Sequence, residues 1–216
     1  INDVSTLEGN SGTTPLAFTV SLSAPSGKSI TVKYATADNT ATTVNNDYVG
    51  VPATLLTFAP GETSKPAAVT VNGDTTDEDN ETLFVNLSDL ANLTTLGSDL
   101  QGVGTITNDD APPTVAFNLN SSQGPETSTP INLEVRLAAA SGRNVTVDYA
   151  VTGGTATPGL GNDFTLLGTG TLTFAPGVTT QNVQLSIFND LLSEDSETVI
   201  VTLSNPIHAS LGSITF

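Results

Sequence analysis

An internal repeat limits the possible folds of this chain more than any other feature. The segment Leu56–Gly61, which reads LTFAPG, returns 116 positions later as Leu172–Gly177. At the same offset Val85–Ser88 corresponds to Val201–Ser204, which again keeps its apolar positions. Self-similarity at one fixed spacing indicates that a structural unit has been duplicated. The sequence therefore predicts two similar domains in tandem.

The two copies meet in a short segment that contains two prolines, Asp110–Pro113. Adjacent prolines favour an extended, stiff connection. We predict a first domain at residues 1–110, a short Pro-rich linker at 111–113 and a second domain at 114–216. The second copy has no counterpart of Ile106–Asp110, so its last strand is expected to be missing or incomplete, as in a C-terminally truncated domain.

Each copy consists of short runs in which apolar and polar residues alternate, such as Leu16–Leu22, Ile30–Tyr34 and Leu83–Leu87. This period of two is typical of strands that pack one face on a core and expose the other to water. Pro60-Gly61 is a strong turn signal between two such runs, and no helical stripe is present. About seven strands in roughly 105 residues predict an all-β fold, a two-sheet sandwich of the immunoglobulin type in each copy.

Composition excludes several functional classes. The chain has 22 acidic and only 5 basic residues, for a net charge of −17, which argues against binding to nucleic acid or to anionic membranes. No apolar run reaches the roughly 20 residues that span a bilayer, so membrane insertion by these residues is not expected. The absence of cysteine excludes disulfides and thiolate metal sites. Charge alone leaves two explanations open, bound cations and a highly solvated surface.

The acidic residues of the first copy gather at the ends of predicted strands. Alternate strand ends of an antiparallel sandwich share a pole, and the last strand runs antiparallel to the Leu83 strand. Four segments distant in the chain should therefore bring their carboxylates together at one pole. These segments contribute Glu8, then Asp47, then Asp74, Asp77, Glu78, Asp79 and Glu81, and finally Asp109 and Asp110.

Carboxylates in such a cluster repel one another and raise one another's pKa unless a cation lies among them. Ca²⁺ suits the cluster best, because it takes six to eight oxygen ligands at about 2.3–2.6 Å and tolerates irregular loops. Zinc is disfavoured because the chain has a single histidine and no cysteine. The alternative is a solvated acidic loop. Recurrence in the second copy favours metal, and the recurring acids are Glu126, Asp163, Asp190, Glu194 and Glu197.

These features together resemble the Calx-β domain, which is found in sodium–calcium exchangers, in integrin β4 and in large bacterial surface proteins. The resemblance covers nearly all of residues 3–110, with a weaker copy at 113–216. The segments that carry it are Glu8–Gly12, Tyr34–Asp38, Asn46–Tyr48, Leu56–Ser64, Asp74–Thr82 and Ile106–Asp110.

The resemblance implies an immunoglobulin-like sandwich that binds calcium at one tip. The implied ligands are Glu8, Asp47, Asp74, Glu78, Glu81, Asp109 and Asp110 in the first copy, and Glu126, Asp163, Asp190, Glu194 and Glu197 in the second. The chain departs from exchanger domains at Gly73 and Asn189, where an acid is common, and at Asn108 in the closing run. The second copy also lacks the closing acids, so its site is expected to be incomplete.

We expect a calcium-binding module of a larger extracellular or cell-surface protein, of the kind found in bacteria, that acts in adhesion or spacing. Its partners would be calcium ions, neighbouring domains of the parent chain and a cell-surface or matrix ligand. Calcium at Asp109 and Asp110, beside the connection between the copies, would stiffen that joint. Two alternatives remain at this point, a structural stalk that needs no metal and a calcium-sensing regulatory tandem of an ion exchanger.

Catalysis is not expected. Nucleophilic catalysis needs a base beside the nucleophile, and the only histidine, His208, has no counterpart in the first copy. Paired carboxylates could serve a glycosidase, but the chain has no tryptophan and only 3 tyrosines to form a sugar platform.

Overall fold

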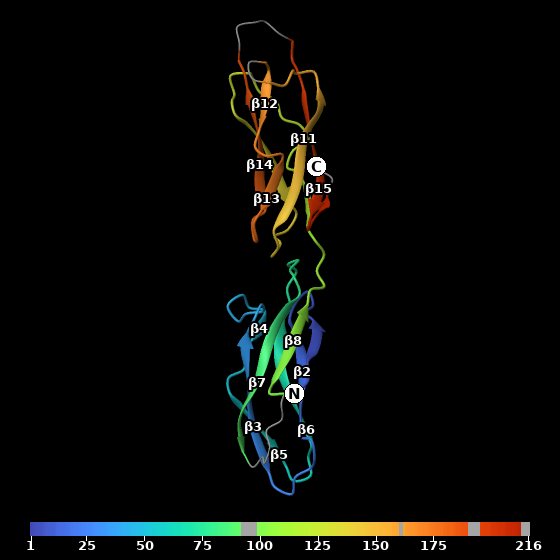
Figure 1. The fold of residues 1–216 in the computed structure, drawn as a ribbon. Helices are drawn as coiled ribbons and strands as arrows, with labels where there is room; N and C mark the ends of the chain where they lie inside the picture. The colour runs from blue at the N-terminus through green and yellow to red at the C-terminus, as the bar shows by residue number, and fades with distance from the viewer. Residues whose placement is uncertain (92–98, 160–161, 190–194, 213–216) are drawn as a thin grey trace. The chain divides into compact units, whose positions relative to one another are not determined.

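The computed structural model describes residues 1–91, 99–159, 162–189 and 195–212 (Figure 1). The chain divides into two compact units, Ile1–Asp110 (unit 1) and Ala111–Phe216 (unit 2). By this division the predicted linker lies at the beginning of unit 2. None of the described residues forms a helix long and apolar enough to cross a membrane.

Unit 1 contains eight strands within the described residues, one more than the approximate prediction because Tyr48–Val49 forms a separate two-residue strand. The strands are β1 (Val4–Leu7), β2 (Thr13–Ser21), β3 (Ile30–Asp38), β4 (Tyr48–Val49), β5 (Thr54–Phe58), β6 (Ser64–Asn72), β7 (Glu81–Ala91) and β8 (Gln101–Thr107). They form two sheets, in the orders β1-β8-β7-β3-β5 and β2-β6-β4. The predicted immunoglobulin-like sandwich is confirmed.

Unit 2 repeats this arrangement with β9 (Thr114–Phe117), β10 (Ile131–Leu137), β11 (Val145–Gly154), β12 (Phe164–Leu167), β13 (Thr171–Phe174), β14 (Thr180–Ile187), β15 (Val199–Ile207) and β16 (Ser210–Leu211). Its sheets have the orders β12-β14-β10-β9-β16 and β13-β11-β15. The first strand gains a partner, since β9 pairs with β10 and also, in parallel, with β16, whereas among the described strands β1 pairs only with β8. The predicted incomplete last strand corresponds to β16, and residues 213–216 lie outside the described part.

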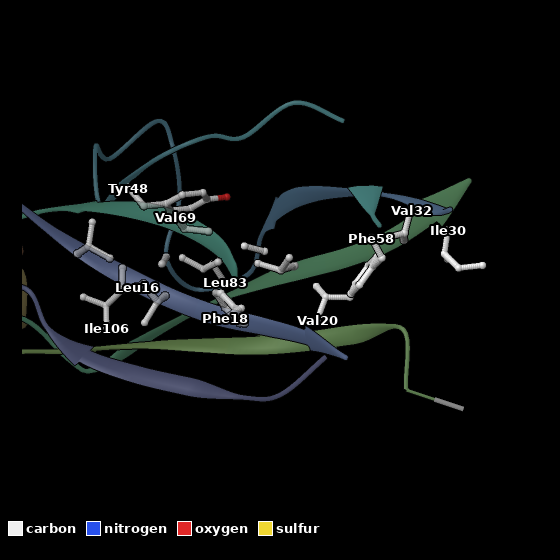
Figure 2. Packing of buried hydrophobic residues seen from close by; sticks show 14 residues of the cluster. Leu16, Phe18, Val20, Ile30, Val32, Tyr48, Phe58, Val69, Leu83 and Ile106 are labelled. Atoms are coloured by element: carbon white, nitrogen blue, oxygen red, sulfur yellow. The ribbon is translucent and has the colours of Figure 1, made fainter. Parts of the chain in front are cut away.

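The core of unit 1 lies between its two sheets, where the apolar face of each alternating strand points inward (Figure 2). Phe18 from β2 and Phe58 from β5 are fully buried, as is Leu83 from β7. Burial of each of these side chains contributes about 1.5–3 kcal/mol to stability relative to an exposed position. This rigid framework fixes the strand ends from which the acidic residues extend.

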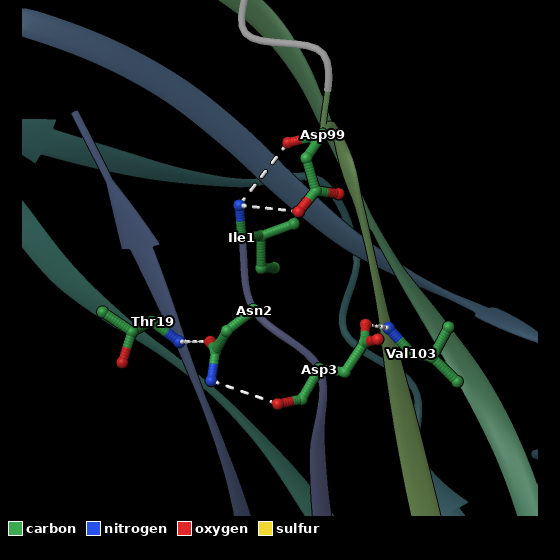
Figure 3. A network of polar contacts seen from close by, with 6 residues as sticks. All are labelled: Ile1, Asn2, Asp3, Thr19, Asp99 and Val103. Carbon is green, nitrogen blue, oxygen red and sulfur yellow. Dashed lines mark hydrogen bonds and ion pairs between the residues drawn. The ribbon is translucent and has the colours of Figure 1, made fainter. Parts of the chain in front are cut away.

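The segment that leads into β1 is tied to both sheets by polar contacts (Figure 3). The Thr19 amide of β2 donates to Asn2 Oδ1 at 2.6 Å, and the Val103 amide of β8 donates to Asp3 Oδ1 at 2.7 Å. Because β1 has only four residues, these bonds help to fix its register against β8. That register determines where the chain after β1 begins.

Candidate metal centre

The end of β1 lies beside the end of β8 because these two strands pair in parallel, with Leu7 opposite Thr107. The Glu8 amide donates to the Thr107 carbonyl at 3.2 Å, and the Gly9 amide donates to Asp109 Oδ1 at 3.0 Å. Parallel pairing makes both strands end at the same edge, so Glu8 and the closing acidic run meet there. Glu8 is buried at this place, with 7% of its surface exposed.

The loop between β6 and β7 begins with an unusually close approach of two backbones. A Cβ atom at Gly73 would lie 1.9 Å from the Gly9 carbonyl oxygen and 2.7 Å from that of Glu8. The Gly73 amide also donates to the Gly12 carbonyl at 3.1 Å. Only glycine fits here, which explains why the chain lacks the acid that exchanger domains commonly carry at this position.

Three partly buried carboxylates form the most compact group of the described residues. One oxygen from each of Asp47, Glu78 and Glu81 lies within 4.8 Å of the others. Asp47 is held by the Thr42 amide, which donates to Oδ2 at 2.6 Å, and by its own carbonyl, which accepts from the Asn72 amide at 3.0 Å. The short distances between the carboxylate oxygens of Asp47, Glu78 and Glu81 are suited to a shared cation.

Burial and mutual repulsion raise the pKa of several acids at this pole. Burial, then the charges of Asp74 and Glu78, raise the pKa of Glu8 to about 7. Burial, followed by a hydrogen bond to Asp47, raises the pKa of Glu81 to about 8. A bond between two carboxyl groups requires a proton on one of them. Crowding and burial thus make the acids of this pole hold protons more readily than free carboxyls do.

Glu78 and Asp110 follow the same trend. Burial, and then the Asp74 charge, raise the pKa of Glu78. Burial likewise raises the pKa of Asp110, against a hydrogen bond from Asn10 that lowers it. The structure thus brings together all the sequence-predicted candidates of the first copy, namely Glu8, Asp47, Asp74, Glu78, Glu81, Asp109 and Asp110. Their role as metal ligands stays a prediction.

Asp110 provides a direct test of whether these residues fit a cation. Its Oδ1 atom accepts from Asn10 Nδ2 at 2.6 Å, but its Oδ2 atom is buried and has no hydrogen-bond partner among the residues that the structure describes. Buried polar atoms without a partner are rare because they lose their hydration without compensation. An oxygen-rich pole with an unpaired carboxylate oxygen matches the ligand preference of Ca²⁺.

Two residues at this pole were not among the predicted ligands. Asp77 is 2% exposed and lies close enough to Glu78 and Asp110 to raise the pKa of each. Asn108 links the end of β8 to the loop between β6 and β7. Its Oδ1 accepts from the Glu78 amide at 3.3 Å, and its Nδ2 donates to Asp77 Oδ1 at 3.4 Å. An aspartate could not make both contacts because it lacks a donor. Asn108 is thus a positioning residue rather than a missing acid.

The corresponding acids of unit 2 are less concentrated among the described residues. Asp163 keeps the local geometry of Asp47, with its Oδ2 accepting from the Thr157 amide at 2.5 Å. Glu126 and Glu197 are exposed, whereas Glu8 is buried. Asp190 and Glu194 lie outside the described residues. The predicted site of the second copy therefore stays a prediction.

Comparison with known proteins identifies both units. The family model of the Calx-beta domain matches residues 3–106 and again residues 108–211. Adhesion G-protein coupled receptor V1 of Danio rerio is 30% identical over 179 residues, which cover 82% of this chain. The chain spans only 3% of the length of that receptor.

Solved structures give weaker likenesses. The crystal structure of CBD12 from CALX1.2 is 25% identical, with 94% of this chain and 77% of that chain covered and a TM-score of 0.45. The calcium binding domain CBD12 of CALX1.1 is 22% identical, with 94% and 76% covered and a TM-score of 0.44.

Proposed function

The chain belongs to the Calx-β family, as two tandem domains, and from this premise we propose that unit 1 binds Ca²⁺ at its acidic pole. The observation that carries the proposal is the buried Oδ2 atom of Asp110, which finds no hydrogen-bond partner in the described part of the chain and lies within a group of mutually repelling carboxylates. A divalent cation would supply the missing partner and offset the repulsion between the carboxylates.

The acids fall into two neighbouring groups that would hold the metal. Asp47, Glu78 and Glu81 offer oxygens within 4.8 Å of one another. Glu8 and Asp110 lie where the ends of β1 and β8 meet, close enough that Asp110 raises the pKa of Glu78 and Glu8 that of Glu81. Carboxylate oxygens are the ligands that Ca²⁺ prefers, and Ca²⁺ tolerates irregular loops better than Mg²⁺, which requires octahedral geometry.

Calcium titration tests the proposal. We expect Ca²⁺ to bind unit 1 and to raise its free energy of unfolding by about 2.7 kcal/mol at a concentration a hundredfold above Kd. Glu78→Gln removes one charge from the triad with little change of shape and should lower the affinity at least about tenfold. Isothermal titration calorimetry, together with hydrogen exchange of unit 1 amides, measures both effects.

The matched control is Asp89→Asn, which removes the same charge from the other end of β7. Eight residues of extended strand place it about 27 Å from Glu81. Asp89 forms an exposed ion pair with Lys33 at 2.8 Å, so its replacement should leave calcium affinity unchanged. Equal affinity of the wild type and Glu78→Gln, or no heat of binding at millimolar Ca²⁺, would contradict the proposal.

We further propose that the tandem is a non-catalytic extracellular module for adhesion or spacing. The similarity to a protein named as an adhesion receptor supports this role over that of a regulatory tandem in an exchanger. The acidic pole favours this role over the role of a structural stalk that needs no metal. Neighbouring domains of the parent chain and a cell-surface or matrix ligand would then be its partners.

Calcium should also affect the connection between the units. Asp110 is the last residue of unit 1, so a cation at its carboxylate would restrict the chain that continues into Ala111. We expect Ca²⁺ to stiffen the joint and chelation to loosen it through carboxylate repulsion. Small-angle scattering checks this. A maximum dimension that stays the same with calcium and with chelator would count against it, whatever the calorimetry shows.

A further inference from the structure

Asp38 at the end of β3 and Tyr48 at the start of β4 form a hydrogen bond next to the acidic pole, since Tyr48 directly follows Asp47. The Tyr48 hydroxyl donates to Asp38 Oδ1 at 2.5 Å. The same oxygen accepts from the Thr43 amide at 3.1 Å, and Asp38 Oδ2 accepts from the Thr43 hydroxyl at 3.5 Å. Tyr48 is 3% exposed and packs with the core of unit 1 (Figure 2), so a fixed side chain anchors Asp38 and, through it, Thr43.

These bonds hold the loop between β3 and β4, which presents Asp47 to the other acids. The Thr42 amide donates to Asp47 Oδ2 at 2.6 Å, and Thr42 directly precedes Thr43. Asp38 therefore fixes both the residue that follows Asp47 and the residue that follows its amide donor. Without a cation, the neighbouring acids repel Asp47, and the bonds of Asp38 oppose the displacement that this repulsion favours.

Unit 2 lacks both members of this pair. Phe164 stands 116 positions after Tyr48 and has no hydroxyl, although it is equally buried at 1% exposed. By strand register Gly154 replaces Asp38, because the two lie opposite residues of β15 and β7 that are 116 positions apart. Unit 2 forms its two sheets without the pair. The hydrogen bond is therefore not a requirement of the fold.

Other bonds of this loop occur in both copies. The Asp47 carbonyl accepts from the Asn72 amide at 3.0 Å, and the Asp163 carbonyl accepts from the Phe188 amide at 2.9 Å. The bond from a preceding threonine amide to the Asp163 carboxylate is also kept. Unit 1 adds the pair, and among the described residues the compact group of three acids also belongs to unit 1. The pair thus accompanies the acidic site rather than the sandwich.

We propose that Asp38 and Tyr48 are positioning residues that hold Asp47 in the place calcium requires before the metal binds. The inference rests on the proposed binding of Ca²⁺ to unit 1 and names two residues that set its affinity. A loop that is already ordered in its bound geometry loses less conformational freedom on binding, which raises affinity. Asp38 acts through its bonds to Tyr48 and Thr43 and not as a ligand.

Four variants of the full chain separate the bonds of Asp38 from its charge. Tyr48→Phe removes the hydroxyl but keeps the ring, as Phe164 does in unit 2. Asp38→Ala removes the acceptor, whereas Asp38→Asn removes the charge but keeps an oxygen that can accept both bonds. We expect Tyr48→Phe and Asp38→Ala each to weaken calcium binding about tenfold, the double variant to weaken it no further, and Asp38→Asn to stay within about threefold of the wild type.

Two measurements distinguish positioning from general stability. Calorimetry gives the calcium affinity of the folded protein, which a purely structural bond would not change. Hydrogen exchange in chelator follows the Thr42 amide, which donates to Asp47 and should exchange about tenfold faster in Tyr48→Phe. The Val85 amide in the centre of β7, a strand paired on both sides, should keep its rate. Tyr34→Phe, which removes a hydroxyl about 13 Å before Asp38 along β3, is the matched control and should bind calcium as the wild type does.

Several results would overturn the inference. Equal calcium affinity of the wild type and Tyr48→Phe would remove it while leaving calcium binding intact. Asp38→Asn as weak as Asp38→Ala would assign the effect to the charge of Asp38. An unchanged exchange rate of the Thr42 amide in Tyr48→Phe would show that Asp47 is held without the pair. A wild type that binds no calcium would overturn the proposed function and this inference together.

Discussion

Replacing Gly73 with aspartate should destabilise unit 1 by about 3 kcal/mol or more, and should weaken calcium binding although it adds an acid. The new Cβ would lie 1.9 Å from the Gly9 carbonyl oxygen, which is backbone and cannot rotate away. Relief of this overlap must separate the loop from the end of β1. Glu8 would then move away from Glu78 and Asp74, whose charges it now faces.

Chemical unfolding and calcium titration of the Gly73→Asp variant measure the two effects. Gly27→Ala is the matched control, since a Cβ at Gly27 meets nothing within 4 Å, and its stability should change by less than about 0.5 kcal/mol. A Gly73→Asp variant as stable as the wild type, with tighter calcium binding, would show that sequence comparison with exchanger domains is the better guide to this position.

The sandwich could be predicted because alternation is a local property of each strand. Phe18 and Val20 point inward from β2 while Ala17 and Thr19 point to solvent, as the sequence pattern requires. The extra strand β4 could not be predicted in the same way. Its two residues show no periodicity, and only their pairing with Val71 and Thr70 of β6 makes them a strand.

The acidic pole could be predicted for unit 1 because antiparallel pairing fixes which strand ends meet. Glu81 at the start of β7 lies opposite Ile106 near the end of β8, as that pairing requires. The parallel pairing of β1 with β8 carries no sequence signal of its own. The contacts of Asn108 also depend on this tertiary arrangement, which is why the sequence alone presents that residue as a lost acid.

The second copy shows the limit of transfer between repeats. Asp163 lies 116 positions after Asp47 and keeps the same bond to a preceding threonine amide. Glu126 follows β9 by nine residues, whereas Glu8 follows β1 directly, so only Glu8 is held by strand pairing. A residue placed by a strand end can be transferred from copy to copy, but a residue placed by a longer segment cannot.

Without calcium, unit 1 is expected to lose about 3 kcal/mol of stability between pH 4.5 and pH 8.5. Burial and neighbouring charges raise the pKa of Glu8 from 4.5 to about 7 and that of Glu81 from 4.5 to about 8. Folded unit 1 therefore binds more protons than the unfolded chain in this range, and the free energy of unfolding falls as pH rises. Each unit of pKa difference is worth about 1.36 kcal/mol, and the total is reduced because Glu8 and Glu81 repel each other, so that their shifts do not add, and because Glu81 is only partly buried.

Saturating calcium should reverse the sign of this dependence. Ca²⁺ binds deprotonated carboxylates, so its affinity rises as Glu8 and Glu81 lose their protons, and the stability of the calcium-bound unit rises over the same range. Hydrogen exchange of unit 1 amides at pH 5 and pH 8.5, with chelator and with calcium after correction for the intrinsic rate, compares the two trends. Glu81→Gln removes the larger shift and should flatten the metal-free trend. A metal-free stability that is constant across this range would mean that the carboxyls do not repel one another enough to need a cation.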